Sequence, residues 1–410
     1  MLASRQRSAA ALVIGVASFA CADQTTAPVP HDSPPALKGT PFSTALLSPQ
    51  WQEQIRILVS SNSISPTVAG RRFAALSVAQ YRAIIAVDED LGTEGSLKTS
   101  GFGAGGRSLY EARRGAVSGA SVEVLSFLFP TAAAALEEQV EAHATFNKEN
   151  VHPSFTRGLA IGRAAGDEMI DHLQNDGFSD PFTGTIPVGE GFWIPAPNVP
   201  PGGANLGGVT PYLINSTSQF RSADPPPFGL SQFNTDLEEV RAIAANRTPQ
   251  QVAIAQFWAT AAGGSTPFGY SAQVAADYID EAGLNERAAT HVFALMHAAQ
   301  FDAQLTCFET KYHYFVIRPS QVPPGNSIVT PPGLPNYPAY PSGHACLMSS
   351  GARVLEHFFP ANTTELESNV TEAGLSRIYA GIHYRFDITA AWTLGRAVAD
   401  WAISHQEALQ

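Results

Sequence analysis

Apolar side chains recur at intervals of three and four residues along most of the chain, and this spacing constrains the fold more than any other feature. In the stretch 49–88 it includes Trp51, Ile55, Phe73 and Leu76. The same spacing continues over 109–128, 131–148 and 155–175. It places apolar side chains on one face of a helix, whereas the period-two alternation of β-branched residues that is typical of strands is scarce. The sequence therefore predicts an all-α protein with several helices in its first half.

A long irregular stretch divides the chain. Residues 177–235 contain many prolines and glycines, and a loop of this length is usually functional or wraps the surface. Helical spacing resumes over 236–245, 249–262, 271–282, 286–314, 342–359 and 384–405, with a second irregular stretch at 319–341. We therefore expect two helical bundles, 43–235 and 236–405, fused into one domain. Such bundles build binding sites from side chains on facing helices.

The charge balance and the N-terminus limit the partners and the location. The 410 residues have a formal net charge of −12, so the chain lacks the basic surplus that binds nucleic acid phosphates. Residues 1–22 have the pattern of an export signal, with Arg5 and Arg7 before an apolar run, and residues 23–42 form a Thr/Pro-rich linker. Cys21 is either the lipidated first residue of a lipoprotein or part of a plain cleavage site. We expect an exported protein, periplasmic, on the cell surface or secreted, with membrane contact only through a lipid on Cys21.

Two further cysteines lie in the C-terminal half. Export permits a disulfide between Cys307 and Cys346, and two buried free thiols are the alternative. Neither cysteine belongs to a Cys/His spacing that indicates zinc.

Three short segments in the last hundred residues indicate an anion site. They are Lys311-x6-Arg318-Pro319, Pro341-Ser342-Gly343-His344 and Ser376-Arg377-x5-His383-x3-Asp387. The arginines present planar forks of N–H donors, which suit the oxygens of phosphate-like anions. The second segment directly precedes a predicted helix, where backbone N–H groups and a hydroxyl face an anion at the positive helix end.

The two histidines of these segments add reactivity to anion binding. His344 and His383 supply a proton donor and a nucleophile or ligand. Asp387, one helical turn after His383, can hold one imidazole nitrogen and leave the other free. Each segment alone also occurs as a surface helix end, a capped turn or a structural ion pair. Together they predict one catalytic pocket that binds a tetrahedral oxyanion.

These segments resemble the signature shared by vanadium-dependent haloperoxidases and type 2 phosphatidic acid phosphatases, without departure at any quoted position. On the haloperoxidase side the resemblance covers about residues 50–405, including Asp302-Ala303, Arg247-Thr248, Phe257-Trp258 and the loop 191–227. It implies that the oxygens of vanadate are bound by Lys311, Arg318, Ser342, Gly343 and Arg377. It further implies that His383 bonds the vanadium and that His344 is the acid/base.

The resemblance implies a vanadate-dependent peroxidase that uses hydrogen peroxide to oxidise a halide to hypohalous acid, or acts on a small organic substrate. The alternative is a phosphatase with phosphate in the same pocket, in which His383 forms a phosphohistidine and His344 protonates the leaving alcohol. A phosphate-binding protein without activity is the third interpretation, but it has no need for two histidines and Asp387. We also expect Asp302 close to Arg377. Tyr337, seven residues before His344, is expected either at the halide-facing wall of the pocket or as packing for its loop.

Overall fold

The computed structural model describes residues 46–91, 104–145, 150–259, 267–323, 328–331 and 333–410. Ser43–Gln410 form one compact unit. The predicted signal, 1–22, and linker, 23–42, lie outside the described residues. Within the described residues no helix combines the length and the apolar character needed to cross a bilayer.

The described residues contain twelve α-helices, and the prediction of an all-α fold is confirmed. The first five are α1 (Leu47–Ser61), α2 (Pro66–Asp90), α3 (Ala104–Leu128), α4 (Ala133–Ala144) and α5 (Pro153–Asn175). The remaining seven are α6 (Ser231–Ala245), α7 (Pro249–Phe257), α8 (Pro267–Glu281), α9 (Glu286–Tyr314), α10 (Gly343–Phe358), α11 (Thr363–Tyr379) and α12 (Arg385–Ser404). The described residues contain no strand; Phe192 and Val316 form an isolated antiparallel bridge.

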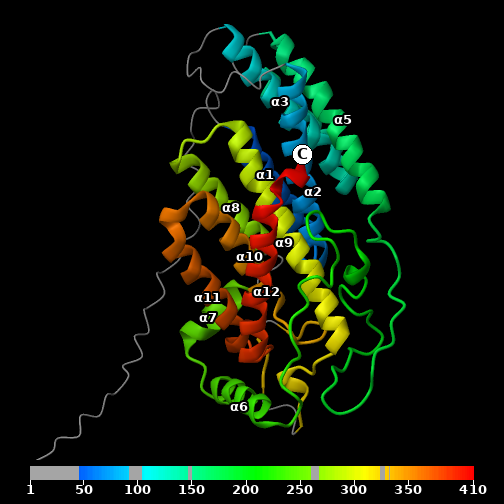
Figure 1. Cartoon of the computed structure of the whole chain (residues 1–410), viewed down its shortest axis with the longest axis vertical. Coiled ribbons are helices and arrows are strands. Elements are labelled where there is room, and N and C mark those ends of the chain that lie inside the picture. Colours follow the sequence, from blue (N-terminus) through cyan, green and yellow to red (C-terminus); the bar gives the residue numbers. More distant parts are fainter. Residues whose placement is uncertain (1–45, 92–103, 146–149, 260–266, 324–327, 332) are drawn as a thin grey trace, which may run out of the picture. The chain divides into compact units, whose positions relative to one another are not determined.

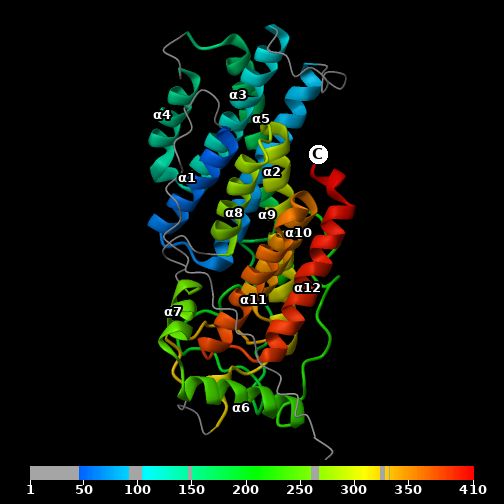
Figure 2. The same ribbon diagram turned by 90° about the vertical axis from the view of Figure 1, so that its left-hand side faces the viewer.

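Helix α9 is the central element of the fold. Asn285 caps its start, since the side chain accepts a hydrogen bond from the amide of Ala288 at 3.0 Å. Most of its 29 residues are buried, because it packs against α2 on one side and against α10 and α12 on the other. Figures 1 and 2 show it, in yellow, beside these helices. Helix α9 therefore contacts helices from both halves of the chain. It also brings Lys311 to the segment 338–341, which precedes α10.

Helices α3 and α5 make the closest backbone contact in the N-terminal part. A Cβ at Gly115 would lie 2.1 Å from the carbonyl oxygen of Phe155, and one at Gly158 would lie 1.8 Å from that of Ala112. Only a residue without a side chain permits this approach. The pair is visible side by side in both views (Figures 1 and 2).

The long irregular stretch is a loop that runs from the end of α5 to α6. It contains one short 3-10 turn, Leu206–Gly208, and α6 follows it at Ser231, about five residues earlier than predicted. Several of its backbone groups bond to the C-terminal half. The amide of Trp193 donates to the carbonyl of Phe315 at 2.7 Å, and the amide of Gly202 donates to that of Asn336 at 2.9 Å. These hydrogen bonds hold the loop against the end of α9 and the segment before α10.

Candidate oxyanion site

Lys311 lies in the last turn of α9 and is completely buried. Its ammonium donates to the carbonyls of Pro338 at 3.0 Å, Ala339 at 2.8 Å and, at a shorter distance, Pro341. Burial lowers the pKa of Lys311 to about 8, which leaves the group charged at neutral pH. All three of its donors are thus occupied by the backbone. In this conformation Lys311 acts on an anion through its charge rather than through a hydrogen bond.

Arg318 follows the left-handed end of α9 at Phe315 and is also completely buried. Its Nε donates to the carbonyl of Tyr337 at 3.0 Å, and its Nη1 donates to that of Ile382 at 2.6 Å. Nη1 also lies 3.1 Å from Nε2 of His383. The second terminal nitrogen, Nη2, is buried and has no partner. A buried N–H donor without an acceptor lowers the stability of the folded protein, unless a bound ligand accepts its hydrogen bond.

The segment before α10 offers a second unpartnered group. Ser342 precedes the first turn of α10, and its amide donates to the carbonyl of Asp387 at 3.0 Å. Its hydroxyl is buried without a partner and does not cap the helix. A Cβ at Gly343 would meet no atom within 4 Å, so open space lies at the N-terminus of this 16-residue helix. Backbone N–H groups at such an end attract anions.

Arg377 reaches the site from α11 and is held by two contacts. Its Nε donates to the hydroxyl of Ser376 at 2.9 Å, and its Nη2 donates to the carbonyl of Ala255 in α7 at 3.0 Å. Burial lowers its pKa to about 10, so it stays a cation at neutral pH. The site thus contains three buried cations.

His383 is buried and oriented by Asp387. Its Nδ1 lies 2.7 Å from Oδ2 of Asp387, which also accepts from the amide of Tyr384 at 3.1 Å. A carboxylate accepts hydrogen bonds, so Nδ1 carries the proton and Nε2 keeps its lone pair. Burial, followed by the charges of Arg318 and Lys311, holds the pKa of His383 well below its usual value. Burial raises the pKa of Asp387 to about 7.

His344 lies in the first turn of α10 and has a backbone partner. Its Nε2 is 2.9 Å from the carbonyl oxygen of Trp258, the residue that follows α7. Because a carbonyl only accepts, Nε2 carries a proton and the lone pair of the neutral ring is on Nδ1. Burial, and then the charge of Arg377, lowers the pKa of His344 to about 3. The ring is therefore neutral and can accept a proton at Nδ1.

The structure brings the three motifs together. Arg318 contacts His383, Lys311 donates to the carbonyl of Pro341, and the amide of Ser342 donates to the carbonyl of Asp387. The charges of Lys311, Arg318 and Arg377 all lower the pKa of His383. The motif residues thus form one buried cluster of positive charge with two neutral imidazoles.

Asp302 has a different role from the one expected. Its carboxylate does not pair with Arg377; it accepts from the amides of Tyr212 at 2.8 Å, Leu213 at 2.7 Å and Ile214 at 3.0 Å. These three donors satisfy a charge that is buried in α9. The partners of the Asp302 carboxylate are thus backbone amides of the long loop, which the sequence pattern does not show, and the expected closeness to Arg377 stays a prediction.

Tyr337 lies beside the cations. Its ring centroid is 5.3 Å from Nζ of Lys311 and 5.1 Å from Cζ of Arg318. Its ring also meets that of Phe308 edge-on, with centroids 5.2 Å apart. This position fits a wall of the site, while its part in halide choice stays a prediction.

Sequence reasoning missed the groups that hold the motif side chains in place. They are mostly backbone carbonyls, at Ala255, Trp258, Pro338, Ala339 and Pro341, and a carbonyl has no side-chain signature. Phe257-Trp258 belongs to the family resemblance, but its residue types do not predict that the carbonyl of Trp258 holds His344. Cys307 and Cys346 are both buried free thiols in the structure, rather than the two halves of a disulfide.

A known protein family matches most of the C-terminal half of the chain. The model of the PAP2 superfamily matches residues 289–409, which contain every motif residue described above. This PAP2 segment comprises most of α9 together with α10, α11 and α12. No curated protein matches the chain.

Solved structures extend the likeness beyond the PAP2 segment. The chain is similar to a bacterial vanadium-dependent iodoperoxidase, with a TM-score of 0.71 and 20% identity over 87% of this chain and 96% of that one. It is also similar to a bacterial vanadium-dependent chloroperoxidase in its holo form (TM-score 0.66, 15% identity, 84% and 93% covered) and its apo form (0.67, 16%, 84% and 95%). At these identities the likeness shows a shared all-α fold.

Proposed function

We propose that this protein is a vanadate-dependent haloperoxidase, which oxidises a halide with hydrogen peroxide to hypohalous acid. The observation that carries the proposal is the pair of buried groups without partners, Nη2 of Arg318 and Oγ of Ser342, near the open N-terminus of α10. Buried donors of this kind are expected to meet an acceptor. A tetrahedral oxyanion provides several acceptors at once, so the residues present fit vanadate.

The residues that would hold vanadate follow from their donors and lone pairs. Its oxygens would be bound by Arg318, Arg377, Ser342 and the amide of Gly343, with Lys311 adding charge. Nε2 of His383, which carries a lone pair and lies 3.1 Å from Nη1 of Arg318, is the atom of this ring that would bond the metal. When bound, vanadate supplies a Lewis acid that makes hydrogen peroxide reactive toward halides.

The protein's own groups prepare the site for proton transfer and negative charge. His344 is neutral with a lone pair on Nδ1, and the negative charge of bound vanadate would raise its pKa from the low value set by burial and Arg377. The ring could then take a proton from hydrogen peroxide and return it later. Three fixed cations stabilise negative charge on oxygen in a buried site, where such interactions are strong. The Tyr337 and Phe308 rings form an apolar wall next to Lys311, which suits a weakly hydrated halide.

The similarity to vanadium-dependent peroxidases over 84–87% of this chain supports this reaction over a phosphatase. The PAP2 segment alone does not distinguish them, because phosphate and vanadate share charge and shape. Phosphate is therefore expected to occupy the same site.

The test titrates the metal-free protein with orthovanadate and measures iodide and bromide oxidation by hydrogen peroxide. We expect activity that saturates with orthovanadate and is lost competitively when millimolar phosphate is added. Arg318→Ala should abolish it, whereas Arg353→Ala, a surface arginine of α10 paired with Asp400, should keep it. Phosphate release from p-nitrophenyl phosphate, without peroxidase activity at any orthovanadate concentration, would replace the proposal with the phosphatase reading.

A further inference from the structure

The C-terminal turn of α7 holds two side chains of the oxyanion site. The last carbonyls of an α-helix have no amide donor within the helix, so other groups must supply their hydrogen bonds. The carbonyl of Ala255 accepts from Nη2 of Arg377 at 3.0 Å. The carbonyl of Trp258, directly after α7, lies 2.9 Å from Nε2 of His344. The side of the His344 ring that keeps a proton therefore depends on where this turn lies.

The side chain of Trp258 fixes the same turn. It is buried, and its ring lies with its centroid 5.0 Å from that of Tyr270. Its indole N–H donates to Oε1 of Glu372 in α11 at 3.1 Å. A buried indole N–H requires an acceptor, and a carboxylate makes a stronger hydrogen bond than a neutral group. One residue thus receives a hydrogen bond from His344 at its carbonyl and donates one to Glu372 through its side chain.

Side-chain hydrogen bonds at both ends of α7 hold this helix against α11, which lies beside it in both views (Figures 1 and 2). Before the start of α7, Nε of Arg247 donates to the carbonyl of Tyr379 at 2.5 Å. After its end, the indole of Trp258 donates to Glu372. The second bond involves the residue whose carbonyl meets His344, so it controls the position of that carbonyl most directly.

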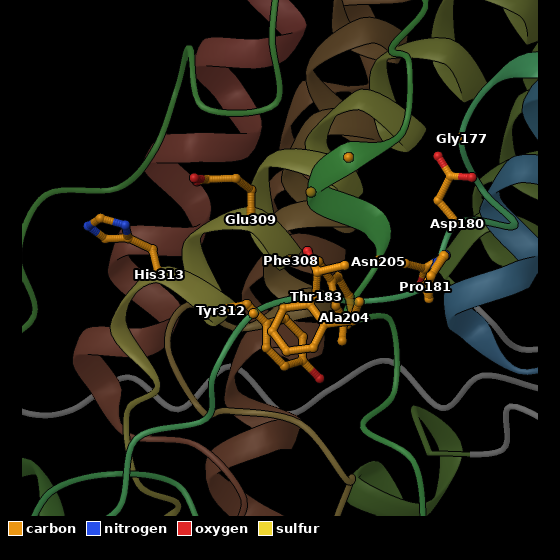
Figure 3. Close-up of a pocket in the computed structure, with 14 residues that line it drawn as sticks. Gly177, Asp180, Pro181, Thr183, Ala204, Asn205, Phe308, Glu309, Tyr312 and His313 are labelled. Carbon is orange, nitrogen blue, oxygen red and sulfur yellow. The ribbon is translucent and has the colours of Figure 1, made fainter.

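The Trp258–Glu372 pair lies outside the cavity that α9 forms with the long loop. That cavity has a volume of about 300 Å³ and is lined by residues from 177–184, 204–208 and 308–313 (Figure 3). Neither Trp258 nor Glu372 is among its lining residues. Substitutions at the pair therefore leave the lining of this cavity unchanged, and their route to the oxyanion site is the carbonyl of Trp258.

We propose that Trp258 and Glu372 are positioning residues for His344. The indole–carboxylate hydrogen bond fixes the carbonyl of Trp258, and this carbonyl holds the Nε2–H of His344. The lone pair on Nδ1 is then kept free for proton transfer. The catalytic consequence rests on the proposed function, whereas the chain of hydrogen bonds from His344 to Glu372 does not.

The hydrogen-bond chain is tested first, in the full chain without vanadate, peroxide or halide. NMR of protein with ¹⁵N-labelled histidine measures the exchange of the His344 Nε2–H with deuterium, and His344→Gln assigns the signal by its absence. Trp258→Phe removes the indole N–H but keeps a ring and the carbonyl, and Glu372→Leu removes the acceptor. We expect roughly tenfold faster exchange in both variants, and no further increase when they are combined. Glu372→Gln keeps an acceptor oxygen and should restore slow exchange.

Glu367→Leu is the matched control for this experiment, because this carboxylate of α11 pairs with Arg396 of α12 instead. It should keep the wild-type exchange rate. Equal exchange rates in the wild type, Trp258→Phe and Glu372→Leu would overturn the proposal. Exchange as fast in Glu367→Leu as in Glu372→Leu would also overturn it, since a general loosening of α11 would then explain the effect.

Turnover is tested second, with orthovanadate, peroxide and bromide, and kcat is expressed per bound vanadate. Trp258→Phe and Glu372→Leu should lower kcat by roughly tenfold, because His344 is less well oriented. The orthovanadate concentration for half-maximal activity should stay within about twofold of the wild type, since Lys311 and Arg318 are unchanged. Wild-type kcat in both variants would overturn the positioning role. Absence of bromide oxidation in the wild type would instead reject the proposed function, and the exchange experiment would still decide whether Glu372 acts on His344.

Discussion

At the scale of single residues, the site depends on which atom of each imidazole is free. His383 donates a hydrogen bond from its Nδ1–H to Asp387, and His344 donates one from its Nε2–H to the carbonyl of Trp258. The two rings therefore present different nitrogens, Nε2 and Nδ1, as lone pairs. One ring can act as a ligand or nucleophile while the other accepts a proton.

This difference predicts unequal losses for two substitutions. His383→Ala should remove catalysis, because the ligating nitrogen is lost. Asp387→Ala should lower activity by roughly 10–100-fold, since the ring keeps its nitrogen but loses its orientation. The measurement is iodide oxidation at saturating orthovanadate, together with the orthovanadate concentration for half-maximal activity. If Asp387→Ala is as damaging as His383→Ala, the carboxylate does more than orient the ring.

Tyr337 carries the second prediction at this scale. Its ring lies near both Lys311 and Arg318, so its polarity should influence which halide approaches them. We expect Tyr337→Phe and Tyr337→His to change the ratio of bromide to iodide oxidation at saturating orthovanadate. The ring lies close to the cations in both variants, so total loss of activity is not expected. Identical halide ratios in the wild type and both variants would reduce Tyr337 to packing for its loop.

At the scale of secondary-structure elements, apolar spacing predicted most helices but not all of them. Helix α11, which carries Arg377, was not predicted, because its sequence has few large apolar residues and its mean hydropathy is close to neutral. The stretch 49–88, predicted to be helical, contains two helices, since Pro66 starts α2 and cannot continue a preceding helix. The site motifs were found from residue types alone. Their backbone partners could not be found, because they depend on how α7 and the loops fold.

The contact of Asp302 with the long loop leads to a prediction about this element. Asp302→Asn replaces an acceptor of three amide bonds by a group with one oxygen and an N–H₂ donor. Hydrogen bonds to charged groups contribute about 1.5–3 kcal/mol, so amide hydrogen exchange at Tyr212, Leu213 and Ile214 should be roughly ten- to hundredfold faster. Asp236→Asn is the matched control, because this carboxylate accepts from the amide of Phe386 instead. Equal exchange rates in both variants would mean that Asp302 does not hold the loop.

At the scale of the whole molecule, buried histidines couple stability to pH. Burial lowers the pKa of His297 to about 3 and that of His143 to about 4. His297 lies in the core with its Nδ1 2.8 Å from the hydroxyl of Ser77, so it links α9 to α2. Both rings are neutral in the folded protein, whereas an unfolded chain protonates them near pH 6.5.

The folded protein should therefore lose stability as the pH falls below about 6.5, because only the unfolded state gains these protons. Each such histidine contributes up to about 1.4 kcal/mol of unfolding free energy per pH unit, until its folded pKa is reached. The glutamine of His297→Gln cannot titrate, so the unfolding free energy of this variant should fall less steeply between pH 6.5 and pH 4. The slopes of the variant and the wild type should differ by up to about 1.4 kcal/mol per pH unit. His313→Gln, an exposed residue of α9, is the matched control and should keep the wild-type slope. Urea unfolding at several pH values measures these slopes, and parallel curves for His297→Gln and the wild type would show that His297 is protonated in the folded state.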